Sequence, residues 1–168
     1  MIFSDILRRI RYALQIKDSS MLELFKSGGV ELELETLIKH LKKEDEDGYA
    51  PLTSKNLTAF LDGLILKKRG VRENPSTSPV KKELLNNNLV LRKIKIALEL
   101  REEDILAILK RSEMEISKSE LSALFRQKNH KNYKVCGDQL LRNFLAGLAV
   151  YMKTSPAEKV RPATGDGA

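Results

Sequence analysis

Three side chains that could act together in catalysis lie within nine residues: His130, Cys136 and Asp138, an imidazole, a thiol and a carboxylate. A cysteine beside a helix N-terminus can have a lowered thiol pKa and act as a nucleophile. The chain contains an internal duplication, however, which aligns Cys136 with Leu52 and Asp138 with Ser54. The alignment with leucine predicts that Cys136 fills apolar space, and Asp138, like Ser54, is predicted to be a helix N-cap. We therefore expect no catalytic residues and no enzymatic activity.

Metal and cofactor chemistry also lacks support. Two distant histidines, His40 and His130, and one cysteine do not make a zinc site. An acidic loop consisting of Glu44, Asp45, Glu46, Asp47 and Gly48 lacks the ligand spacing of a calcium loop, and Gly28 and Gly29 lack the Lys-Ser/Thr pair of a phosphate loop. No metal, cofactor or small-molecule substrate is expected. The acidic loop is predicted to be solvated, and His40, which aligns with Leu124, is predicted to be buried or half-buried.

The charge pattern favours a binding protein. The 168 residues include 30 Lys and Arg and 23 Asp and Glu, giving a formal charge of +7, and the excess lies in the second copy of the duplication. A basic loop, residues 126–134, occupies the position that the acidic loop has in the first copy. Both copies also carry a basic trio in their first helix, Arg8, Arg9 and Arg11 in one and Arg92, Lys93 and Lys95 in the other.

The elements that must position these groups follow from the duplication. Residues 5–70 align without a gap with residues 89–154, and 15 of the 66 positions are identical. Most identities are apolar and recur at helical spacing, so they indicate a shared core. We predict an all-α fold of two tandem four-helix repeats, residues 1–70 and 88–154. The Pro- and Ser-containing segment 71–87 is predicted to be a linker, and residues 155–168 a disordered tail.

Helix ends are predicted from capping residues. Ser4 and Asn88 are expected to cap the first helix of each repeat, Ser20 to open the second helix of the first repeat, and Ser117 with Glu120 to form a capping box in the second repeat. The second helix of the first repeat is expected to stop at Gly28 and Gly29.

The compartment follows from composition. A single cysteine cannot form an internal disulfide, charged residues interrupt the N-terminal apolar stretch, and no span reaches membrane length. We expect a cytoplasmic protein that does not interact with membranes.

Several motifs resemble a bacterial family. Residues 86–93, 96–98 and 104–109 resemble its second repeat, as do residues 130–133, 136–139, 141–142 and 144–145. Residues 43–49, 60–65 and 68–70 resemble its first repeat. The chain is similar to the YehS-like family, domain of unknown function 1456, which carries two tandem copies of the domain. His40 stands where this family has a large aromatic residue. The resemblance implies no catalytic residue, cofactor or substrate.

The leading hypothesis is binding of RNA or DNA, because basic side chains with Asn, His and Tyr suit phosphate contacts and base stacking. The predicted surface consists of Asn86, Asn87, Asn88, Arg92, Lys95, Lys128, His130, Lys131, Asn132, Tyr133 and Arg142. The alternative is a protein adaptor or a self-associating module in which the acidic and basic loops are paired docking sites. A solvated face without a partner also accounts for the charge, and Tyr133 can instead anchor its loop, since Tyr49 occupies the same position in the first repeat.

Overall fold

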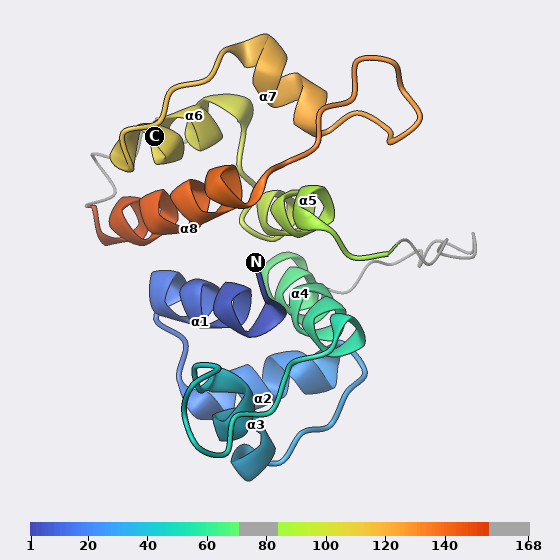
Figure 1. Cartoon of the computed structure of the whole chain (residues 1–168), viewed down its shortest axis with the longest axis vertical. Helices are drawn as coiled ribbons and strands as arrows, with labels where there is room; N and C mark the ends of the chain where they lie inside the picture. Colours follow the sequence, from blue (N-terminus) through green and yellow to red (C-terminus); the bar gives the residue numbers. More distant parts are fainter. Residues whose placement is uncertain (71–83, 155–168) are drawn as a thin grey trace. The chain divides into compact units, whose positions relative to one another are not determined.

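The computed structural model describes residues 1–70 and 84–154, and within them it contains eight helices and no strand (Figure 1). The first repeat forms α1 (Phe3–Leu14), α2 (Asp18–Ser27), α3 (Leu34–Leu41) and α4 (Ser54–Arg69). The second forms α5 (Asn87–Ala97), α6 (Glu102–Arg111), α7 (Lys118–Leu124) and α8 (Asp138–Lys153). Each helix of the second repeat begins 84 residues after its counterpart, which confirms the all-α fold with four helices per repeat. Most of the predicted linker, residues 71–83, and the predicted tail lie outside the described residues.

Contacts divide the chain into two compact units. Unit 1 contains residues 1–8 and 16–99, and unit 2 contains residues 9–15 and those from 100 onward. The boundary passes through α1, and α5 belongs to unit 1, where it packs on α4. Lys93 of α5 and Asp62 of α4 form an ion pair of 2.5 Å in that unit. The compact units therefore differ from the sequence repeats at the first helix of each repeat.

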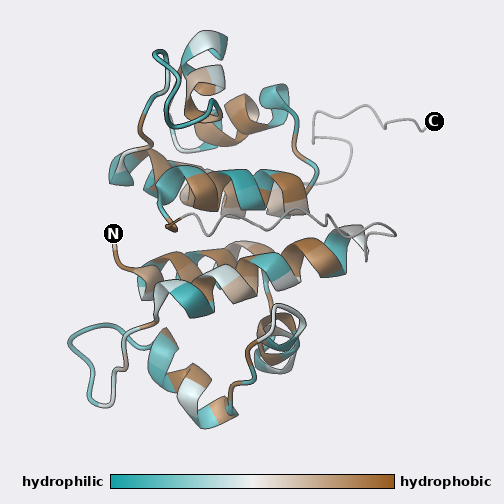
Figure 2. Cartoon of the chain, turned by 90° about the vertical axis from the view of Figure 1, so that its right-hand side faces the viewer, coloured by the Kyte–Doolittle hydropathy of each residue, from teal (hydrophilic) through white to brown (hydrophobic). Residues whose placement is uncertain are grey.

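In each repeat the second and fourth helices form the central contact of the core. The residues that α2 and α4 bury between them include Leu24, Phe25 and Phe60, and the two phenylalanine rings lie 5.3 Å apart. Their close approach requires Gly63, because a Cβ atom there would lie 1.8 Å from the carbonyl oxygen of Leu24. Helices α6 and α8 pack on each other in the same way. Figure 2 shows that hydrophobic and hydrophilic residues alternate along the helices of both units. The shared apolar identities thus mark a shared core.

Several predicted helix ends shift by one or two residues. The N-caps of α4 and α8 are Thr53 and Gly137, so the prediction of Ser54 and Asp138 was wrong. Ser4 lies inside α1, and Asn86 rather than Asn88 caps α5 with its side chain. Helix α2 begins at Asp18 and not at the predicted Ser20. At α4 and α5 another accepting side chain, Thr53 or Asn86, lies one or two residues upstream of the predicted cap, and the path of the incoming chain decides which one reaches the free N–H groups.

Two other helix ends confirm the predictions. Ser117 and Glu120 form the capping box of α7. Helix α2 ends at Ser27 and is followed by Gly28 and by Gly29, whose φ of +101° suits glycine. In the second repeat Glu113 takes the position of Gly29 with φ +62°, so the backbone turn is kept without its usual residue.

Candidate binding surfaces

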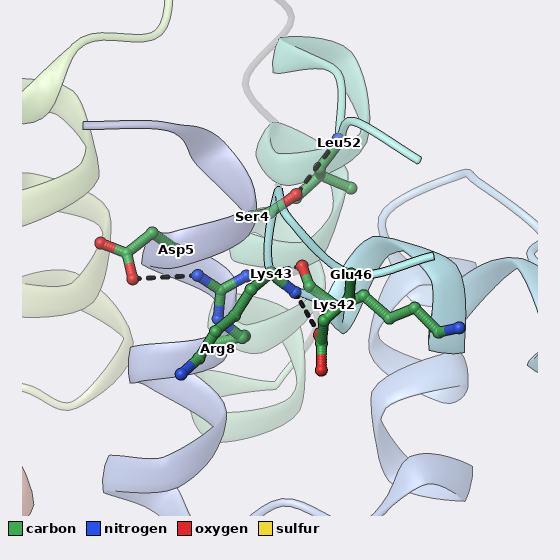
Figure 3. Close-up of polar contacts among 7 residues, drawn as sticks. All are labelled: Ser4, Asp5, Arg8, Lys42, Lys43, Glu46 and Leu52. Atoms are coloured by element: carbon green, nitrogen blue, oxygen red, sulfur yellow. Dashed lines mark hydrogen bonds and ion pairs between the residues drawn. The ribbon is translucent and has the colours of Figure 1, made fainter. Parts of the chain in front are cut away.

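The acidic loop leaves α3 along a path held by hydrogen bonds (Figure 3). The Arg8 guanidinium donates to the carbonyl oxygen of Lys42 over 2.8 Å and pairs with Asp5. The backbone N–H of Lys43 donates to the Glu46 carboxylate over 2.6 Å. At the other end of the loop, the buried Ser4 hydroxyl accepts from the N–H of Leu52. Arg8, one of the predicted basic trio, therefore has a structural role in unit 1.

The carboxylates of the acidic loop face solvent. Glu44, Asp45, Glu46 and Asp47 are all exposed, as predicted. Among the described residues, the side chains of Glu44, Asp45 and Asp47 form no hydrogen bond or ion pair. The Lys42 ammonium donates to the backbone oxygen of Asp47 over 2.6 Å and leaves its carboxylate available. The loop therefore presents a local excess of negative charge.

The basic loop of unit 2 repeats the backbone of the acidic loop. In the first repeat the backbone N–H of Ala50 donates to the carbonyl oxygen of Lys39 over 3.1 Å. At the equivalent positions of the second repeat, the backbone N–H of Lys134 donates to the carbonyl oxygen of Ala123 over 3.0 Å. The N–H of Tyr133 donates to the carbonyl oxygen of His130, as the N–H of Tyr49 does to that of Glu46. One backbone conformation thus carries opposite charges in the two repeats.

Two of the four cations in the basic loop hold it in place. The Arg126 guanidinium donates to the carbonyl oxygen of Asn132 over 3.3 Å, and Lys134 pairs with Glu120 of α7 over 3.1 Å. The backbone N–H of Ser117 and, after it, the Lys134 ammonium lower the pKa of the Glu120 carboxyl. His130 Nδ1 accepts from the N–H of Asn132 over 3.0 Å, so its Nε2 atom is the one left for other contacts. These bonds hold the basic loop in one conformation.

The other two cations remain available. Lys128 and Lys131 are exposed, and within the described part of the chain neither forms a hydrogen bond or an ion pair. Tyr133 is half-buried beside them, as Tyr49 is in the acidic loop. The structure therefore brings Lys128, His130, Lys131, Asn132 and Tyr133 together on one ordered loop.

The remaining predicted surface residues lie elsewhere. Asn86 caps α5 by accepting from the N–H of Leu89 over 2.8 Å, and Asn88 is buried, so both serve the fold. Asn87, Arg92 and Lys95 lie on α5 in unit 1 and are partly exposed. Arg142 lies on α8 in unit 2 and donates to Gln139.

The candidate catalytic thiol is buried. Cys136 is only 2% exposed, and its burial, followed by the negative charge of Asp138, raises the pKa of the thiol to about 11. An activated nucleophile requires the opposite shift. His40 is also buried, as predicted, and its Nδ1 atom lies 2.8 Å from the carbonyl oxygen of Ala50, to which it can only donate. Both side chains therefore serve the packing of their repeats.

No group of three or more His, Cys, Asp or Glu in residues 1–70 and 84–154 is arranged to hold a metal ion. A search of the same residues for a helix with the length and apolar character needed to cross a bilayer also finds none.

Helix α3 carries an exposed apolar pair that was not predicted from the sequence. Leu34 and Ile38 are 46% and 45% exposed and lie one helical turn apart. The signal that could have found them is their alignment with polar residues, Lys118 and Ser122. Because the second repeat has polar residues at these two positions, the core that both repeats share does not require apolar residues there.

Comparisons agree with the internal duplication. The family described as "Protein of unknown function (DUF1456)" matches residues 4–70 and again residues 87–153. The "Uncharacterized protein YehS" of Escherichia coli (strain K12) is 42% identical over 150 residues, which are 89% of this chain and 95% of that protein. No solved structure matches the chain. The chain therefore belongs to the DUF1456 family and carries two tandem copies of its domain.

Proposed function

We propose that the protein binds nucleic acid, with the basic loop of the second repeat contacting phosphate groups. One observation carries the proposal: Lys128 and Lys131 are exposed and free of partners among the described residues, on a loop that Arg126 and Lys134 already hold in shape. A preformed loop loses little conformational entropy when it binds. Exposed ammonium groups bind phosphates and release counterions, which favours association.

The first repeat supports this assignment as an internal control. Its loop has the same backbone hydrogen bonds but carries Glu44 and Asp47 where the second repeat has Lys128 and Lys131. The fold therefore does not require positive charge at these positions. The single buried cysteine is consistent with a protein that acts in the reducing cytoplasm.

Binding should be measured with fluorescently labelled oligo-uridine RNA and with a labelled DNA duplex, over a series of salt concentrations. The double variant Lys128→Glu/Lys131→Glu should bind more weakly. On duplex DNA it should flatten the slope of log affinity against log salt by about two units, since each phosphate contact contributes about 0.9, and somewhat less on single strands.

The matched control is Lys17→Glu/Lys55→Glu. Both lysines are exposed near helix N-termini, where glutamate is tolerated, and the variant changes the net charge equally. It should keep most of the affinity and the slope of the parent protein. If the two double variants behave alike, or if no RNA or DNA binds at low salt, the proposal is wrong.

The opposite signs of the two loops favour a second candidate, a protein adaptor. Complementary charges of this kind set the orientation of a protein complex. If the protein is an adaptor, its protein partner binds Glu44 and Asp45, and an added polyanion should not displace that partner. Reversing the charges of Glu44 and Asp45 should then abolish capture of the partner and leave RNA binding unchanged.

A further inference from the structure

The pair Leu34 and Ile38 on helix α3 is left nearly half exposed by its own repeat. Helix α3 packs on its unit through Leu37 and His40, which are buried, whereas Leu34 and Ile38 lie at the edge of this buried face and are nearly half exposed. Helix α7 begins at the equivalent residue and buries Leu121 and Leu124 in the same places. An exposed apolar side chain is common singly, but two that are adjacent on a helix make a small continuous patch.

The second repeat shows that the fold tolerates polar residues at these positions. Lys118 and Ser122 take the places of Leu34 and Ile38 on α7, whose start corresponds to that of α3. Water therefore solvates this helix face in one repeat, while the other keeps two large apolar side chains on it. Burial against a partner is the physical gain that such side chains offer.

The charged residues near Leu34 and Ile38 indicate which kind of partner this surface would bind. Glu33 stands at the N-cap of α3 without forming a side-chain cap hydrogen bond, whereas Ser117 caps α7 from the same position. Within the described residues four carboxylates near α3 have no hydrogen-bonded or paired cation: Glu33, Glu44, Asp45 and Asp47. Of three nearby lysines, Lys39 pairs with Glu35 over 3.7 Å and Lys42 donates to a backbone oxygen. Lys43 is exposed beside Glu44, so the four carboxylates still outnumber the available cations.

We infer that the exposed face of α3, extended by the acidic loop, docks a positively charged protein segment that carries apolar side chains. Apolar groups of the segment cover Leu34 and Ile38, and its cations meet the free carboxylates of Glu33, Glu44 and Asp45. A nucleic acid or an anionic membrane would be repelled by the same carboxylates. This surface lies in unit 1 and does not depend on the nucleic-acid proposal.

The probe is a fluorescein-labelled peptide of Leu and Lys about four helical turns long, patterned as an amphipathic helix. Its fluorescence anisotropy is measured against the full chain. The Leu/Lys peptide should bind the parent protein, a Ser/Lys peptide of equal charge should bind more weakly, and a Leu/Glu peptide should not bind. Failure of the Leu/Lys peptide to bind the parent protein would overturn the inference.

The decisive variant is Leu34→Lys/Ile38→Ser, which gives α3 the residues of α7. It should weaken peptide binding about tenfold or more, the scale of losing the burial of one large apolar side chain. The control Leu66→Lys/Val150→Ser makes a similar change, from two aliphatic side chains to lysine and serine, at two other exposed positions, one in each repeat, and should bind like the parent protein. Equal binding by both variants would overturn the inference.

Two further measurements test whether the pair instead belongs to the core of its repeat or to a contact between two copies of the chain. The melting temperature of Leu34→Lys/Ile38→Ser should fall only slightly, because each side chain is already nearly half exposed, and a drop as large as that of the core variant Leu37→Ala would assign the pair to the core and overturn the inference. Sedimentation velocity of the protein alone should show one mass at all concentrations. The inference would also be overturned if the mass of the parent protein rose with concentration while Leu34→Lys/Ile38→Ser stayed a monomer. A second copy of the chain would then cover this face.

Discussion

The Cα atom of Gly147 in α8 lies directly against the carbonyl oxygen of Ile108 in α6, and a Cβ atom added to this glycine would stand 2.0 Å from that oxygen. Gly63 has the same relationship to Leu24 in the first repeat, at 1.8 Å. No relaxed structure contains a Cβ atom so close to a backbone oxygen. These two glycines therefore set the distance between the second and fourth helices of both repeats.

Replacing either glycine by alanine should destabilise the protein although alanine favours helices. Gly63→Ala and Gly147→Ala force the packed helices apart, at a cost of about 1–3 kcal/mol or more that exceeds the gain of about 1 kcal/mol in helix propensity. Urea denaturation measures the change. The control Ala146→Gly, at the exposed neighbour of Gly147, isolates the propensity and should cost about 0.5–1 kcal/mol. A stabilised Gly147→Ala would contradict the packing argument.

The N-cap of α8 can be improved by copying the first repeat. Thr53 accepts a hydrogen bond from the N–H of Asn56 over 3.1 Å, whereas the equivalent Gly137 has no side chain and nothing lies within 4 Å of the place its Cβ would occupy. Gly137→Thr should therefore stabilise the protein by a few tenths of a kcal/mol, roughly the measured difference between these caps. The reverse change, Thr53→Gly, should lower the midpoint of thermal unfolding. An increase with Thr53→Gly would refute the ranking of these two caps.

The buried Cys136 thiol should react slowly in the native protein. Its pKa of about 11 lies above the ordinary value of 9.0, so near pH 8 the folded state holds about 100-fold less thiolate than the unfolded state. Iodoacetamide labelling, followed by mass spectrometry, should be at least that much slower in buffer than in concentrated urea. Comparable rates in the two solutions would show that the thiol is accessible.

The raised pKa of the Cys136 thiol also makes the free energy of unfolding depend on pH. Because its pKa is higher in the folded state, the contribution of this group to stability is complete below pH 9 and is lost as the pH rises through about 11. The variant Cys136→Ala removes this titration. The difference in unfolding free energy between the parent protein and Cys136→Ala should thus shrink between pH 9 and 11, and a difference that grows would contradict the assignment.

Tyr49 and Tyr133 should act as anchors for their loops. Each is half-buried at the same position of a loop, and a base-stacking ring would serve no purpose in the acidic loop. Tyr49→Ala and Tyr133→Ala should each reduce the free energy of unfolding, by about 1–2 kcal/mol for a partly buried ring. Thermal unfolding and RNA binding should be measured together. Loss of RNA affinity in Tyr133→Ala with an unchanged melting temperature would assign its ring to stacking on a base.

Local patterns in the amino-acid sequence were sufficient to predict the helices and their duplication. Apolar residues at helical spacing, repeated without a gap, predicted eight helices in the right order, and the structure gives each pair the same separation along the chain. The capping box of Ser117 and Glu120 and the stop at Gly28 were also predicted correctly. Such signals succeed because helix periodicity and capping depend on residues within one or two turns.

Which of several similar residues remain exposed without an internal contact depends on how the loops close and the helices pack. Arg126, Lys128, Lys131 and Lys134 look equivalent in the sequence, yet Lys134 pairs with Glu120, 14 residues away, while Lys128 and Lys131 remain without partners among the described residues. Leu34 and Leu37 are equally apolar, but one is exposed and the other buried. These distinctions arise when loops close and helices pack, because both processes join residues that are distant along the chain and whose meeting local sequence does not encode.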